Sequence, residues 1–194
     1  MAFPFQVPTF FKEFVKDVFD PRADGNCGFR CLAKALNYED NDGWFKVRNE
    51  LVNHLEANQK YYKHFLGGAT GVDTISSGLK VEGVNESITQ TKWLSNVDHG
   101  QIIANTYNQP ISFLCSNLHH CSTYIPLRSA PSESLEPIVL SFVNGNHWLF
   151  VYVQGDTVPI PTPFQSKPLK AAKPWPKLIK AQTSLWEEFC KNNN

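Results

Sequence analysis

The stretch Asp-Gly-Asn-Cys-Gly-Phe-Arg at residues 24–30 puts a cysteine directly after a turn and at the expected start of a helix. The run that follows, CLAKALNY at 31–38, has the apolar spacing of a short helix. Unpaired amides and the dipole at a helix start stabilise negative charge, so the thiolate of Cys27 is easier to form there. The backbone amides of Gly25, Asn26 and Cys27 are candidates for an oxyanion site, because Gly25 permits unusual φ and ψ angles.

A histidine suited to carry protons stands much later in the chain, where the periodicity changes. Short runs rich in β-branched and aromatic residues predict strands at 111–115, 123–127, 137–142 and 147–153. Val-Asn-Gly-Asn at 143–146 carries the Asn-Gly pair that favours a tight hairpin. His147 opens the last strand, and an imidazole is the usual acid and base near neutral pH.

These two segments resemble the ovarian-tumour (OTU) family of cysteine proteases, in which Asp-Gly-Asn-Cys holds the nucleophile and a late strand begins with histidine. The resemblance covers roughly residues 20–153. It implies an α+β, papain-like fold of the OTU type, in which a helical half carrying the nucleophile packs on a small mixed or antiparallel β-sheet. Cys27 would be the nucleophile and His147 the general base and acid. The implied reaction is hydrolysis of isopeptide bonds after the C-terminal Gly-Gly of ubiquitin or polyubiquitin, without a metal or another cofactor.

One departure from the family pattern leaves the third catalytic residue open. Many members place Asn or Asp two residues after the histidine, where this chain has Leu149. Asp24 is carried over from the motif as an orienter of the imidazole or a support of the oxyanion loop. A Cys/His dyad, or an acid from elsewhere, is the alternative. Candidates for substrate contacts are Trp93, Asn146 and Trp148.

Two other functions share the same fold. The chain can instead be a protease for a ubiquitin-like modifier or a polyprotein, because the chemistry is identical. It can also be an inactive OTU-like module that binds ubiquitin without cleaving it. Leu149 favours the inactive module, and the intact segment around Cys27 argues against it.

Composition restricts the partners and the compartment. The chain has 194 residues, a formal net charge of zero and no long apolar run, so we expect a monomer that binds neither nucleic acid nor membrane. Its five irregularly spaced cysteines predict a reducing, cytoplasmic setting, which is the host cytosol if the source is a virus or an intracellular bacterium. The spacing of Cys115, His119, His120 and Cys121 matches no common zinc module.

We expect a catalytic domain over 1–157, a linker or strap over 158–176 and an amphipathic helix over 177–194. The middle segment contains six prolines, and five lysines lie between 167 and 180, a composition that favours extended chain. Apolar spacing predicts helices at 9–19, 42–56 and 98–108. The region 67–91, which is rich in glycine and small polar residues, predicts a long loop.

Overall fold

A five-stranded mixed sheet forms the centre of the molecule. The computed structural model describes residues 7–38, 41–131, 136–164 and 167–192. The strands lie in the order β1-β5-β4-β2-β3, in which β2 and β4 are parallel and the other neighbours antiparallel. Their bounds are β1 Val15–Phe19, β2 Ile111–Leu114, β3 Ser122–Tyr124, β4 Ile138–Val143 and β5 His147–Val153.

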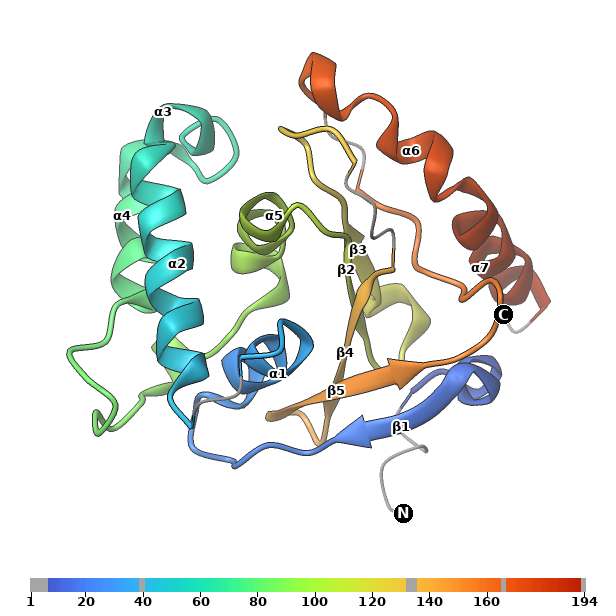
Figure 1. Ribbon diagram of the computed structural model, residues 1–194, viewed down its shortest axis with the longest axis horizontal. Coiled ribbons are helices and arrows are strands. Elements are labelled where there is room, and N and C mark those ends of the chain that lie inside the picture. Colours follow the sequence, from blue (N-terminus) through green and yellow to red (C-terminus); the bar gives the residue numbers. More distant parts are fainter. Residues whose placement is uncertain (1–6, 39–40, 132–135, 165–166, 193–194) are drawn as a thin grey trace.

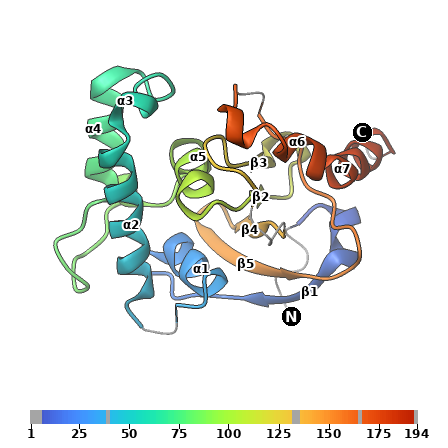
Figure 2. The ribbon, with the colours of Figure 1, turned by 45° about the horizontal axis from the view of Figure 1, so that its top comes forward.

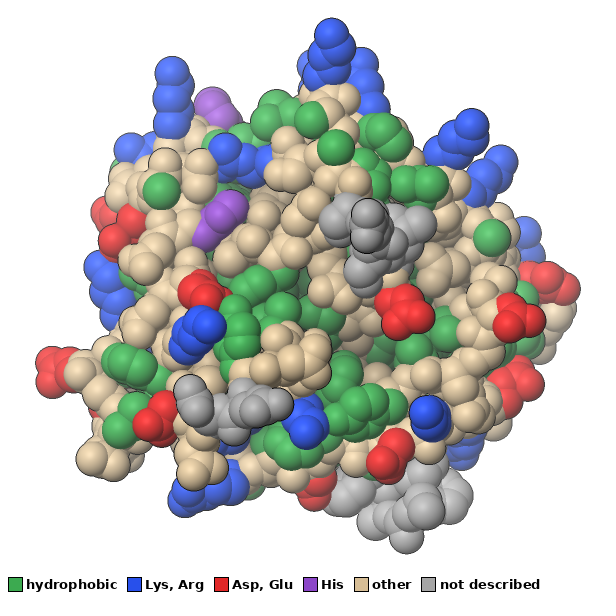
Figure 3. Space-filling model, viewed as in Figure 1, with side chains coloured by type: hydrophobic (Ala, Val, Ile, Leu, Met, Phe, Trp, Pro, Cys, Tyr) green, Lys and Arg blue, Asp and Glu red, His purple; other side chains and the backbone are tan. Residues whose placement is uncertain are grey.

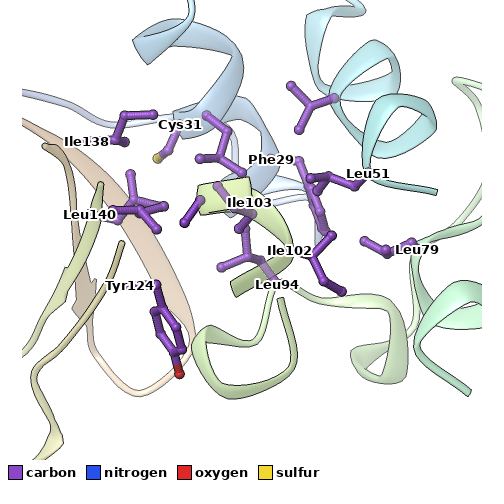
Figure 4. Packing of buried hydrophobic residues seen from close by; sticks show 14 of the residues in the cluster. Phe29, Cys31, Leu51, Leu79, Leu94, Ile102, Ile103, Tyr124, Ile138 and Leu140 are labelled. Atoms are coloured by element: carbon purple, nitrogen blue, oxygen red, sulfur yellow. The ribbon is translucent and has the colours of Figure 1, made fainter. Parts of the chain in front are cut away.

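A helical half covers one face of this sheet, as the sequence predicted. Figure 1 shows α1 and α5 next to the sheet, and α2, α3 and α4 beyond them. The bounds are α1 Cys27–Ala35, α2 Gly43–Ala57, α3 Gln59–Tyr62, α4 Gly68–Leu79 and α5 Asn96–Tyr107. One apolar core joins the two halves: Figure 4 shows Phe29 and Cys31 of α1 near Ile103 of α5, with Leu140 of β4 close by. The predicted α+β architecture is therefore confirmed.

The C-terminal part of the chain packs on the opposite side of the sheet. Figures 1 and 2 show α6 (Trp175–Leu178) and α7 (Lys180–Asn192) on the side away from α2. Trp186 of α7 is buried with Phe11, Val139 and Val151, and Phe189 stacks on Phe10 with ring centroids 4.9 Å apart. A third apolar cluster joins Trp175, Ile160 and Leu127. The division of the chain at 157 and 176 stays a prediction.

Two expected elements are wrong. Residues 9–19 do not form one helix: a 3-10 helix covers Thr9–Phe14, and the rest is β1, which pairs with β5 at the edge of the sheet. The apolar spacing suited a helix, but the free edge of β5 gives this segment backbone partners. The region 67–91 is not a loop throughout, because α4 buries Val72, Ser76 and Leu79 on one face, and Gln90–Lys92 is a 3-10 helix.

The hairpin between β4 and β5 is as predicted and fixes the position of His147. Asn144 and Gly145 have φ of 56° and 73°, and the amide of Asn146 donates to the carbonyl of Val143 at 3.2 Å. Positive φ at both central residues matches the twist of the flanking strands. His147 therefore pairs with Val143 at the first position of β5.

Candidate active site

The loop before α1 is held tightly around two glycines. Gly25 has φ +82°, and a Cβ atom there would lie 2.8 Å from Cβ of Ile88 and 3.0 Å from Nε1 of Trp93. At Gly28, a Cβ would lie 2.6 Å from Cβ of Leu94. Side chains at these positions are excluded, because the segment 88–94 packs directly on the loop and on the first turn of α1. Cys27 is the first residue of that helix.

The thiol of Cys27 lies against the backbone amide of Trp148, the residue that follows His147. Only 6% of Cys27 is exposed. Burial raises the pKa of the Cys27 thiol above its usual value despite hydrogen bonding from the amides of Trp148 and Gly28, so the easier ionisation expected at a helix start is not found. One turn later, Sγ of Cys31 donates to the carbonyl of Trp148 at 3.4 Å. Helix α1 therefore docks on the start of β5, which brings Cys27 beside the peptide that joins His147 and Trp148.

The imidazole of His147 has one occupied nitrogen and one unoccupied nitrogen. Its Nε2 is 2.8 Å from Oδ1 of Asp20. Its Nδ1 is buried and has no hydrogen-bond partner among the described residues. A buried polar atom without a partner is costly and is typical of functional sites. The carboxylate of Asp20 fixes the ring, and Nδ1 stays free for a proton.

Asp20 is a site residue that the sequence reasoning missed. It directly follows β1, whose last residue Phe19 pairs with Phe150 of β5. Continuing this register by one residue sets Asp20 level with Leu149, on the same side of the ribbon as His147. The carboxylate of Asp20, one residue past β1, thus contacts the ring in a chain that has Leu at position 149. Reading 9–19 as a helix hid this signal, because only a paired strand aligns Asp20 with β5.

Asp24 contacts Arg30 and Asn26, so of its two expected roles the contacts favour support of the oxyanion loop over orientation of the imidazole. Its Oδ2 is 2.7 Å from Nη2 of Arg30, and its Oδ1 accepts the amide of Asn26 at 3.0 Å. Burial raises the pKa of Asp24, but the hydrogen bonds from Arg30 and Asn26 outweigh it and lower the pKa below its usual value. The two carboxylates therefore have different contacts: Asp20 binds the imidazole, and Asp24 braces the turn before Cys27.

The residues predicted for the oxyanion site and for substrate contacts differ in their burial and in their hydrogen bonds. The amide of Asn26 is occupied by Asp24, which leaves those of Gly25 and Cys27 as candidates for an oxyanion. Nε1 of Trp93 is buried and has no partner within the described chain. Trp148 is 7% exposed and donates its indole N–H to the carbonyl of Leu94 at 3.1 Å. Asn146 is exposed in the hairpin turn.

An apolar groove with a volume of about 560 Å³ includes Trp148 and Leu94 in its wall. Phe142 and Phe113 flank Trp148, with ring centroids 4.8 and 5.4 Å from it. Phe164, which is 61% exposed, lines the same groove. On the face shown in Figure 3, hydrophobic side chains gather in a central hollow, and charged residues of both signs surround it.

The described residues hold neither a metal-binding cluster nor a membrane-spanning helix. Among residues 7–38, 41–131, 136–164 and 167–192, no three His, Cys, Asp or Glu side chains come together in a way that could hold a metal ion. The thiols of Cys115 and Cys121 both contact the carbonyl of Asn117. In the same described residues, no helix is long and apolar enough to cross a membrane.

Comparison with solved structures finds a similar fold in an OTU domain protease. The viral OTU domain protease from Qalyub virus matches with a TM-score of 0.51 and 17% identity, covering 74% of this chain and 87% of that chain. The OTU domain of OTUD1 matches with a TM-score of 0.46 and 19% identity over 70% of this chain and 84% of that chain. The Hazara virus OTU, solved bound to ubiquitin, gives 0.44 and 13%, with 77% and 87% covered.

Sequence comparisons add nothing to this, since no family model and no curated protein matches the chain significantly. The structural match nevertheless confirms the predicted fold class. Over 74% of its length, and at low sequence identity, the chain is structurally similar to the Qalyub virus OTU protease.

Proposed function

We propose that this chain is a cysteine protease that hydrolyses the isopeptide bond after the C-terminal Gly-Gly of ubiquitin. One observation carries the proposal. The thiol of Cys27 lies at a helix start against the amide that follows His147, while Asp20 holds Nε2 of that imidazole and Nδ1 stays unpaired. A thiol, an imidazole and an orienting carboxylate are the parts that acyl transfer needs.

In the proposed reaction, Nδ1 of His147 takes the proton of the Cys27 thiol, and the sulfur attacks the carbonyl carbon of the terminal glycine. The amides of Gly25 and Cys27 stabilise the oxyanion. As the C–N bond breaks, the imidazolium gives its proton to the departing lysine amine. Water then attacks the thioester and gives one proton to His147, which passes it to the released sulfur, while ubiquitin leaves as a carboxylic acid that loses its own proton to solvent.

The groove beside Trp148 can accommodate an extended, partly apolar substrate tail. Its wall joins Leu94, which packs on the first turn of α1, to the rings of Phe113 and Phe142. The close approach of segment 88–94 to Gly25 leaves little width beside the nucleophile, which suits two glycines in succession. Trp93 and Trp148 would form the walls of this passage.

The position of Asp20 weakens the case for an inactive binding module. Leu149 was the feature that favoured inactivity, and Asp20 supplies the missing hydrogen bond to the imidazole. A protease for a ubiquitin-like modifier would use the same residues, so only the substrate separates it from a deubiquitinase.

The test uses ubiquitin and the interferon-induced modifier, each carrying a C-terminal electrophile, with the full chain and its Cys27→Ala variant. The proposal predicts a covalent adduct on Cys27 with the ubiquitin probe, and no adduct in the variant. An adduct with the other probe alone would assign the chain to that modifier. Binding of ubiquitin without an adduct would make it a binding module. Retained cleavage of diubiquitin by Cys27→Ala would refute the mechanism.

A further inference from the structure

Arg48 of α2 is a fully buried cation. It contacts α4, the segment before Trp93, and the loop at residues 24–26 that precedes Cys27, called the nucleophile loop below. Its exposed fraction is 0%. Its Nε donates to Oδ1 of Asn26 at 2.9 Å, and its Nη2 donates to the carbonyl of Lys92 at 2.7 Å. Its Nη1 donates to the carbonyls of Gly78 and Leu79 at 3.3 and 3.2 Å. One guanidinium therefore joins three separate segments of the chain.

The partners of Arg48 are neutral, which makes its burial costly. Burial lowers the pKa of Arg48 to about 10, so the group stays charged near neutral pH. No carboxylate lies within ion-pair distance in the described residues. The guanidinium lies 3.8 Å from the ring centroid of Phe29 and donates to the last carbonyls of α4, where a helix presents negative charge. An apolar side chain would fill the same space without this cost.

The contact with Asn26 links Arg48 to the loop that precedes the candidate nucleophile Cys27. Asn26 is 3% exposed and directly precedes Cys27, and Arg48 is the side chain that holds its amide oxygen. The same guanidinium holds the carbonyl of Lys92, next to Trp93, whose indole packs on Gly25. Arg48 therefore sets the loop before Cys27 and the wall that faces it relative to each other.

We propose that Arg48 is a positioning residue for Cys27 that acts through the side chain of Asn26. It touches neither the reacting atoms nor the thiol, and it fixes the backbone angle at which α1 presents the sulfur to the imidazole. This rests on the proposed function, because it names how that nucleophile is held. Since a displacement of about 1 Å can lower a rate about 100-fold, loss of this contact should appear in kcat rather than in KM.

The test is a double-mutant cycle on turnover of a ubiquitin substrate, with Arg48→Lys, Asn26→Ala and the double variant. Lysine keeps the charge but lacks the planar fork that reaches all three segments. Each single variant should lower kcat about 10- to 100-fold with KM changed less than about threefold. If Arg48 acts through Asn26, the double variant is no slower than the slower single variant, within about twofold. A double variant whose kcat falls by the product of the two single-variant factors would overturn the proposal.

A second readout does not depend on ubiquitin. In a background with Cys115, Cys121 and Cys190 changed to serine, the rate at which iodoacetamide alkylates Cys27 is measured against pH for the same four proteins. The double variant should again be alkylated no more slowly than the slower single variant, within about twofold. Asn26→Asp should keep the Arg48 contact and alkylate faster than Asn26→Ala at high pH, with its profile moved to higher pH by the added negative charge.

The control separates positioning from loss of stability. Tyr107→Phe removes a hydrogen bond of 2.9 Å to Glu50, on the same helix α2 but without contact to Asn26. It should lower the melting temperature without changing kcat or the alkylation rate by more than about twofold. An alkylation rate that Arg48→Lys and Asn26→Ala leave unchanged would overturn the positioning role, even if ubiquitin is cleaved. If no ubiquitin probe reacts but the coupled alkylation pattern appears, the substrate assignment fails and the role of Arg48 stands.

Discussion

Cys27 and His147 reach the candidate site from regions that are held in different ways. The nucleophile loop is buried, and Arg48, Asp24 and the segment 88–94 each fix a part of it. The imidazole stands at the end of a hairpin, and its described hydrogen bond goes to a carboxylate whose side chain is 45% exposed. Changes around the cysteine should therefore affect both stability and rate. Changes around the histidine should affect the rate almost alone.

The largest effect that tests this contrast is expected for His147→Ala. Loss of the general base should lower kcat/KM for a ubiquitin substrate about 10⁴-fold. The free energy of unfolding should change by less than about 1 kcal/mol, because the variant removes a buried nitrogen that has no partner among the described residues. Single-turnover kinetics and urea denaturation measure the two quantities. A large loss of stability would show that the histidine is structural.

Next in size is the difference between two nearby carboxylates. Asp20→Ala should lower kcat about 100-fold with little change in KM, because the ring loses the acceptor that holds it. Asp24→Ala should lower kcat at least about tenfold less, since Asp24 braces the loop through Arg30 and Asn26. Parallel kinetic assays of the two variants show which carboxylate orients the imidazole. The reverse order of effects would return the orienting role to Asp24.

The parts of this site that local sequence signals specify were predictable. A turn before an apolar-periodic run gave the start of α1 at Cys27, and the Asn-Gly pair gave the hairpin that sets His147. Both signals lie within a few residues of the feature that they determine. The resemblance to OTU proteases then joined the two distant segments.

The parts that depend on pairing between distant segments were not predictable in this way. Apolar residues at 10–18 fit a helix as well as a strand, and only the exposed edge of β5 decides for β1. Asp20 enters the site through that pairing, so the error in β1 also hid the carboxylate. The helix α4 was missed for another reason: its glycines outweighed the spacing of Val72, Ser76 and Leu79.

A smaller effect concerns Leu149, the position where many OTU proteases carry Asn or Asp. Leu149 is 1% exposed, and Leu149→Asn should lower the free energy of unfolding by about 2–3 kcal/mol, because it buries an amide in apolar surroundings. It should not raise kcat, since Asp20 already occupies Nε2 of His147. Denaturation and turnover assays check both. An increase in kcat would show that Asp20 holds the ring poorly.

The smallest effect distinguishes the bracing role of Asp24 by its pH dependence. The pKa of Asp24 is lowered in the folded protein, so its stabilisation is present above the unfolded value of 3.8 and is lost as pH falls through the folded value. Because its side chain is 28% exposed, solvent screening limits the contribution to about 0.5–1 kcal/mol. Asp24→Asn should therefore be less stable than the parent in urea at pH 7, and the difference should shrink as the pH falls below 3.8.

Asp17→Asn is a matched control, since Asp17 is exposed and its hydrogen bond goes to the adjacent amide of Val18. A difference for Asp24→Asn that does not vary with pH would mean that the ion pair with Arg30 adds nothing to the rigidity of the loop, and that Arg48 and segment 88–94 alone hold the nucleophile.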